Sequence, residues 1–191
     1  MPSQSLLSWR TNRLPRLNEV EVQCAATAAL VPAPDLADEN LRGYVMLLSA
    51  HFQGFCRDLH TECVQVLASA APSPMALTIQ TQGLANRGLD GGNPRFETIR
   101  EDFERFALAL KAVLAPDAVT KTANERRITH LGHLSHWRNY CAHHKNASPS
   151  EGGPLSVATV QGWKDSCHGL AEELDRVMYN RLRAVTGSAP W

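Results

Sequence analysis

The most restrictive feature of this sequence is a long segment in which apolar residues recur every three or four positions. It runs from Leu41 to about Ala70 and ends at the prolines of APSP. Such spacing places apolar side chains on one face of an α-helix, whereas a half-buried strand alternates every second residue. The segment therefore predicts one long helix, with a buried face formed by Leu41, Val45, Leu48, Phe52, Phe55, Leu59, Cys63 and Val66.

Shorter segments with the same periodicity indicate further helices. One covers residues 20–31, a second about 96–114 and a third about 124–144, and a last one extends from the N-cap residue Ser156 to Leu182. The glycine-rich stretch at 75–95 predicts a loop. We therefore expect an all-α protein, an up-and-down bundle of four to five helices. Residues 1–37 would form an N-terminal arm and a short helix, and residues 38–186 the helical domain, with Trp137 and Trp163 in its core.

Composition limits the classes of function. The 191 residues are 43% hydrophobic, which suits one globular domain. Nineteen basic residues balance nineteen acidic ones and exclude a broadly basic surface, so an RNA site would have to be focused. No apolar run reaches the length of a membrane span. The five scattered cysteines favour a reducing compartment, the cytoplasm, and Cys56 and Cys63 should pack as small apolar residues.

The sequence WRNYCAHHK, residues 137–145, brings an arginine, an asparagine and two histidines together at the end of a periodic segment. Asn139 and His143 are four residues apart and share one helical face. Arg138 and His143 are five apart, which separates them by about 140° around the helix axis. One straight helix therefore does not direct both side chains to one point. A frayed end, a second helix or a second subunit would have to complete such a site.

These residue types are sufficient to cleave RNA without a metal. A base removes the proton of the ribose 2′-hydroxyl, which attacks the adjacent phosphorus, and an acid protonates the leaving 5′-oxygen. Imidazole can perform both proton transfers near neutral pH. Arginine matches phosphate geometry with paired donors, and asparagine can orient an imidazole or bind a phosphate oxygen.

The wider sequence resembles the HEPN superfamily, in the branch related to ribonuclease-like stress and defence proteins. The stretch ITHLGHLSHWRNYCAHHK is similar to its motif, in which a helix ends in RN-x-x-A-H, usually before glycine. The stretch LLSAHFQGFCRDLHTE is similar to its long early helix. The resemblance covers most of residues 38–186. Gln53 departs from it where an acidic residue is common, and His144 departs from it where glycine is common.

The resemblance implies a HEPN-type bundle and a metal-independent endoribonuclease that needs no cofactor. His143 would transfer protons, Arg138 would bind the scissile phosphate, and Asn139 would position both. Cleavage would leave a 2′,3′-cyclic phosphate and a 5′-hydroxyl. Family members commonly form homodimers in which two motifs share a groove. RNA would be the substrate, and an antitoxin or another defence protein would be a partner in a toxin–antitoxin or antiviral defence system.

Further residues are candidates for binding the substrate near the motif: His144, Lys145, Arg127, Gln53 and Arg57. Arg57 and His60 lie off the apolar stripe of the long helix, where they would line the groove or face solvent. The same residues allow three other interpretations. The motif can be a helix end whose cations face the negative end of the dipole. His133 and His136 can be metal ligands. The bundle can also be a non-catalytic module that binds RNA or protein and dimerises.

Overall fold

A computed structural model of the chain describes residues 1–29, 34–143 and 149–191. The described residues form helices and loops without a strand, which confirms the all-α class. None of the helices in this part of the chain combines the length and the apolar character that crossing a membrane requires. Along the chain, the helical elements are α1 (Gln4–Ser8), a π-helical turn (Trp9–Arg13), α2 (Leu14–Ala29), α3 (Pro34–Ala70), α4 (Ser73–Leu84), a 3-10 turn (Gly88–Asp90), α5 (Phe96–Glu104), α6 (Leu110–Val113), α7 (Ala118–His143) and α8 (Val157–Thr186).

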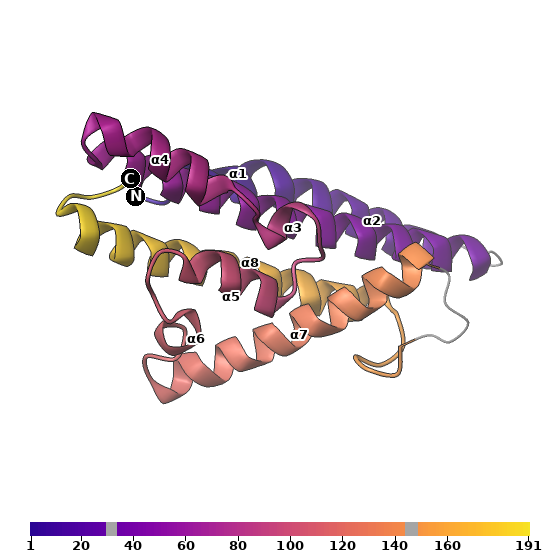
Figure 1. The fold of residues 1–191 in the computed structure, drawn as a ribbon. Coiled ribbons are helices and arrows are strands. Elements are labelled where there is room, and N and C mark those ends of the chain that lie inside the picture. The colour runs from indigo at the N-terminus through magenta and orange to yellow at the C-terminus, as the bar shows by residue number, and fades with distance from the viewer. Residues whose placement is uncertain (30–33, 144–148) are drawn as a thin grey trace.

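Helix α3 is the centre of the bundle and contacts α2, α4, α7 and α8 (Figure 1). Its predicted stripe is confirmed from Leu41 to Cys63, and Val66 is half-buried at the edge of the core. Cys56 and Cys63 are fully buried, as expected for thiols that pack like apolar groups. On the neighbouring helices, Trp137 and Trp163 also lie in the core.

The N-terminal residues differ from the expected arm, because they form helices that pack on the bundle. Trp9 is fully buried, and its ring centroid lies 6.0 Å from that of Phe52 and 5.7 Å from that of Phe55. Its indole Nε1 donates a hydrogen bond to Nδ1 of His168 on α8, at 3.1 Å. The predicted boundary between residues 37 and 38 falls inside α3. The first residues therefore belong to the core of the same bundle.

The predicted loop at 75–95 contains helix α4, which the sequence pattern did not indicate. The helix begins next to Pro74, and none of its residues is buried. It packs on α3 through Gly83, where a Cβ atom would lie 2.9 Å from both methyl groups of Val64. The prediction of a loop holds for the residues after α4, which make one 3-10 turn before α5 begins.

The remaining helix ends have local causes. The predicted helix at 96–114 is interrupted after Glu104, and Ala107 has a φ of 53° in this break. Helix α7 starts earlier than predicted, because the Asp117 carboxylate accepts hydrogen bonds from the first turn at 2.9 and 3.0 Å. Ser156 is the predicted N-cap of α8 and accepts from the backbone N–H of Thr159 at 3.1 Å.

Candidate functional site

The motif RNYCAH forms the last turns of α7. The apolar stripe of this helix is buried as far as Trp137, which is 6% exposed. Arg138 and Asn139 follow directly and are half-buried, whereas His143, the last residue of the helix, is exposed. The stripe therefore fixes the helix on the bundle and leaves the polar residues of the motif within reach of solvent.

Aromatic and charged contacts attach this end of α7 to the first turns of α3. The Tyr140 ring packs edge-on against Trp137, with centroids 5.5 Å apart. The guanidinium of Arg42 lies 5.4 Å from the centre of the same ring and is paired with Asp38. Burial raises the pKa of the neighbouring Cys141 thiol, which therefore stays protonated at neutral pH and is a poor nucleophile.

Asn139 is the most constrained polar residue of the motif. Its Oδ1 accepts a hydrogen bond from Nδ2 of Asn93 at 2.5 Å and a longer one from Nη1 of Arg138 at 3.4 Å. Two donors on the oxygen fix the orientation of the amide and leave its NH₂ group able to donate elsewhere. Sequence reasoning missed Asn93, since its partner is 46 residues away and nothing in the glycine-rich stretch marks it.

The loop that carries Asn93 is attached to three helices. Its 3-10 turn is bound by the Asp102 carboxylate of α5, which accepts from the N–H groups of Gly88 and Leu89 at 3.1 and 2.9 Å. The side chain of Gln53 on α3 donates to the carbonyl of Leu89 at 2.7 Å. Gln53 thus has a structural contact that a carboxylate, which cannot donate, would not make. Through Asn93, the loop also reaches α7.

Arg138 and His143 remain apart on the single chain. Arg138 forms no ion pair within residues 1–29, 34–143 and 149–191, and His143 makes no hydrogen bond to another described side chain. The two residues lie on an uninterrupted helix, so the separation of about 140° around the axis applies. The guanidinium of Arg138 and the imidazole of His143 therefore lie on different sides of the end of α7.

Two of the other predicted substrate-binding residues, Arg127 and Arg57, lie away from the motif. Arg127 precedes Arg138 by eleven residues, or about 16 Å along the helix. Its Nη1 donates to Asn124 at 2.8 Å, and its guanidinium lies across Gly169 of α8, so it joins two helices. Arg57 is exposed on α3, one turn beyond Gln53. His144 and Lys145 lie outside the described residues.

Two histidines of α7, His130 and His136, have separate partners. Nδ1 of His130 lies 2.8 Å from the hydroxyl of Ser166 on α8, and His136 is paired with Glu151 at 2.6 Å. Burial and the nearby His130 lower the pKa of His133. Across the described ranges, no three His, Cys, Asp or Glu side chains converge in a way that could hold a metal ion.

Two hollows border the end of α7. The first, of about 330 Å³, is lined by Asn139, Tyr140, His136, Arg95 and Glu151, among others. The second, of about 460 Å³, adjoins it across Tyr140 and Pro149 and includes the Arg42 and Asp38 pair. Both hollows are polar in part and open to solvent, so an extended polar chain fits them better than a compact apolar ligand does.

No protein-family model, curated protein or solved structure matches the chain in comparisons of sequence and fold.

Proposed function

We propose that the protein is a metal-independent endoribonuclease of the HEPN type, acting through Arg138, Asn139 and His143. The observation that carries the proposal is the end of α7, where a guanidinium without an ion-pair partner among the described residues, an oriented amide and an exposed imidazole lie within six residues. These groups provide the phosphate binding and the proton transfer that RNA cleavage needs. The hollow beside Asn139 provides room for the strand.

In the proposed mechanism, His143 removes the proton of a ribose 2′-hydroxyl, and the resulting oxygen attacks the adjacent phosphorus. The bond to the 5′-oxygen breaks, and the imidazolium formed at His143 gives its proton to that oxygen, which leaves His143 neutral again. The products carry a 2′,3′-cyclic phosphate and a 5′-hydroxyl. Arg138 stabilises the charge on the non-bridging oxygens, and the NH₂ group of Asn139 donates to one of them.

The separation of Arg138 and His143 on one helix favours a site built by two copies of the chain. In a two-fold dimer, Arg138 of one protomer faces His143 of its partner, and the arrangement repeats on the other side of the axis. The biological setting we propose is that of a defence or toxin–antitoxin effector in the cytoplasm, with an antitoxin or another defence protein controlling access to the groove.

The test is an RNA cleavage assay in the presence of a chelator, with His143→Ala as the key variant. General acid–base catalysis is worth roughly 10²–10⁴-fold, so we expect the rate to fall by about that factor. The matched control is His51→Ala, which removes a half-buried imidazole of α3 that lies near Arg13 and Arg16. We expect this control to keep full activity, with 2′,3′-cyclic phosphate ends on its products. Equal inactivity of the wild type and His143→Ala on tRNA and mRNA would contradict the proposal.

A second function is favoured by the hydrogen bond of Gln53, which gives that position a structural role. In this alternative the bundle binds RNA or a protein without turnover, and the motif serves the dimer interface. His143→Ala would then weaken binding or association, while neither protein cleaves RNA. Lost cleavage with unchanged RNA affinity would exclude this alternative.

A further inference from the structure

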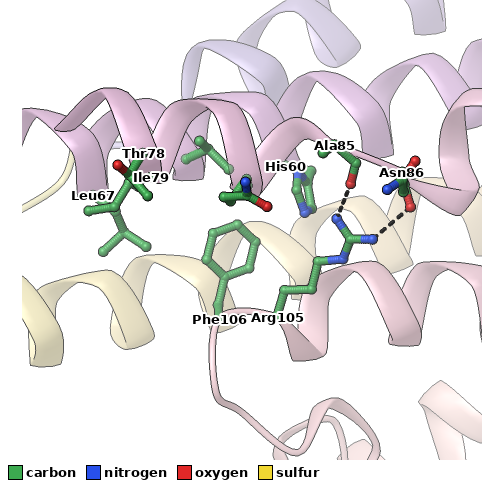
Figure 2. Close-up of a pocket in the computed structure, with 11 residues that line it drawn as sticks. His60, Leu67, Thr78, Ile79, Ala85, Asn86, Arg105 and Phe106 are labelled. Carbon is green, nitrogen blue, oxygen red and sulfur yellow. Dashed lines mark hydrogen bonds between the residues drawn. The ribbon is translucent and has the colours of Figure 1, made fainter. Parts of the chain in front are cut away.

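A separate cavity lies between α3, α4 and the segment that follows α5 (Figure 2). Its volume is about 580 Å³, within the range of about 300–1,000 Å³ that is typical of small-molecule sites. It shares no lining residue with the two hollows at the end of α7. Most of the wall is apolar and is formed by Val64, Leu67, Ile79 and Phe106.

Among the polar side chains of this wall, His60 on α3 is the buried one, and one of its ring nitrogens has no partner among the described residues. It is fully buried, and its ring packs against Phe106, with centroids 4.9 Å apart. Its Nε2 lies 3.2 Å from the backbone carbonyl of Asp102, which can only accept, so Nε2 carries the proton. Burial lowers the pKa of His60 to about 4, and the ring is neutral at neutral pH. Its Nδ1 is therefore a buried acceptor, and it has no hydrogen-bond partner among the described residues.

The one charged side chain that lines the cavity, Arg105, already has its hydrogen bonds made. Arg105 donates to the backbone carbonyls of Ala85 and Asn86, both at 2.7 Å (Figure 2). Its guanidinium also lies 3.8 Å from the Asp102 carboxylate. The cation is thus directed along the rim of the cavity and balanced by a carboxylate. An anionic ligand would gain little from Arg105 and would be repelled by the lone pair of His60 Nδ1. A cationic ligand would lose its hydration without meeting a carboxylate, because none of the lining residues is acidic.

We propose that this cavity is a binding site for a small neutral molecule with an apolar, ring-sized body and one O–H or N–H group that donates to Nδ1 of His60. A buried acceptor without a partner costs free energy in the empty protein, and a donor on the ligand removes this cost. The apolar wall contributes affinity, while the single acceptor selects for the donor. This inference is independent of RNA cleavage.

Helix α4 provides the route into the cavity. It forms one wall through Thr78, Ile79 and Gly83, and it buries none of its own residues. Its principal packing partner is α3, and Met75 and Leu77 are 57% and 70% exposed. Because little apolar surface is buried by α4, a small displacement of this helix costs less than a displacement of any core helix. Nδ1 of His60 is covered in the structure, so a hydrogen bond from a ligand to this atom requires such a displacement.

The test uses 2-naphthol, which carries one hydroxyl donor, and naphthalene, which has the same ring body without it. Titration of the full chain should give a dissociation constant about tenfold lower for 2-naphthol, as one satisfied buried acceptor predicts. In protein labelled with ¹⁵N histidine, the Nδ1 resonance of His60 should shift with 2-naphthol and stay unchanged with naphthalene. Equal affinities, an unshifted resonance, or no binding of either compound would overturn the proposal.

Two variants locate the site. His60→Phe keeps an aromatic ring without the acceptor, so 2-naphthol should lose its tenfold preference while naphthalene still binds. Ile79→Trp, on the face of α4 that lines the cavity, puts a larger side chain into the space and should weaken both compounds at least tenfold. Unchanged binding by Ile79→Trp would place the compounds elsewhere and overturn the assignment. The difference in affinity between 2-naphthol and naphthalene for the wild-type protein tests the proposal even if His60→Phe does not fold.

Discussion

At the scale of single residues, Asn93 is the clearest addition to the candidate site. Its NH₂ group donates to the oxygen of Asn139, and this contact keeps the amide of Asn139 turned with its own NH₂ group outward. Asn93 touches no reacting atom in the proposed mechanism, so it acts as a positioning residue. Its effect should appear in the chemical step more than in the binding of RNA.

We therefore expect Asn93→Ala to lower kcat for RNA cleavage about tenfold, the value of one hydrogen bond, with KM changed less than about twofold. Asn93→Asp keeps the shape but turns an acceptor toward Oδ1 of Asn139, and should lower kcat at least as much. The conservative substitution Asn93→Gln retains the donor and should recover part of the rate. Steady-state kinetics on one RNA substrate measure all three. A lower rate that comes entirely from KM would contradict the positioning role.

His60 gives the protein a specific response to acid. Burial, with help from the nearby Arg87, lowers the pKa of His60 from 6.5 to about 4. The unfolded chain therefore binds a proton between these values that the folded chain does not bind. The free energy of unfolding should be greatest above pH 6.5 and should fall as the pH drops toward 4, by about 3 kcal/mol from this residue alone.

Urea unfolding of the wild type and His60→Phe at several pH values measures this contribution. Other groups titrate in the same range, including His51 and His133, whose pKa values are also lowered. The informative quantity is therefore the difference between the two proteins. The free energy of unfolding of the wild type minus that of His60→Phe should fall by about 3 kcal/mol between pH 6.5 and pH 4. A difference that does not change with pH would show that His60 does not titrate in this way.

At the scale of elements, the sequence predicted the parts of the fold that bury a regular stripe. α3 and α8 followed from their apolar periodicity, and the N-cap at Ser156 from its residue type. α4 did not, because Met75 and Leu77 point to solvent and the helix contacts its neighbour through a glycine. A pattern of buried residues cannot reveal a helix that buries none.

The same limit applies to the candidate site. Arg138, Asn139 and His143 are close in sequence, so a motif could predict them. Asn93 reaches the site through a contact between residues far apart in the chain, and the cavity at His60 depends on how α4 and α5 pack beside α3. Arg127 of α7 likewise lies against α8 only because Gly169 of that helix leaves space for its guanidinium. Only tertiary structure contains these relations.

A buried ion pair joins three helices and gives an element-scale prediction. Nζ of Lys164 on α8 bonds to Asn18 at 2.6 Å and to Glu21 at 2.7 Å, both on α2. Tyr44 on α3 donates to the same carboxylate at 2.9 Å. Lys164→Met would leave the Glu21 carboxylate without its cation in a poorly hydrated position, and we expect the free energy of unfolding to fall by about 3 kcal/mol.

The double variant Lys164→Met/Glu21→Gln removes both charges and should recover most of that loss, which urea unfolding can measure as a double-mutant cycle. The two substitutions should be coupled because the loss of stability comes from the unpaired Glu21 carboxylate, which the second substitution removes. If the two substitutions instead destabilise the protein additively, the pair does not act as a unit.

At the scale of the whole molecule, the arrangement of helices places the end of α7 at the surface, away from the α4 side of the bundle (Figure 1). Within one chain, Arg138 and His143 share this helix end but are separated by about 140° around its axis. A two-fold dimer of this surface would create two composite sites, each with Arg138 from one protomer and His143 from the other. Two inactive variants of such a dimer should restore each other's activity, which variants of a site within one chain cannot do.

Arg138→Ala and His143→Ala should each be inactive alone and should restore activity when mixed. In a mixed dimer, one site lacks both residues, while the other has an intact Arg138 from one variant and an intact His143 from the other. Random exchange makes half of the dimers mixed, so the mixture should recover about one quarter of the wild-type rate. Native mass spectrometry verifies that mixed dimers have formed, and the chelated RNA assay measures the rate. Mixed dimers without activity would mean that each site belongs to one chain, because a shared site must respond to the exchange.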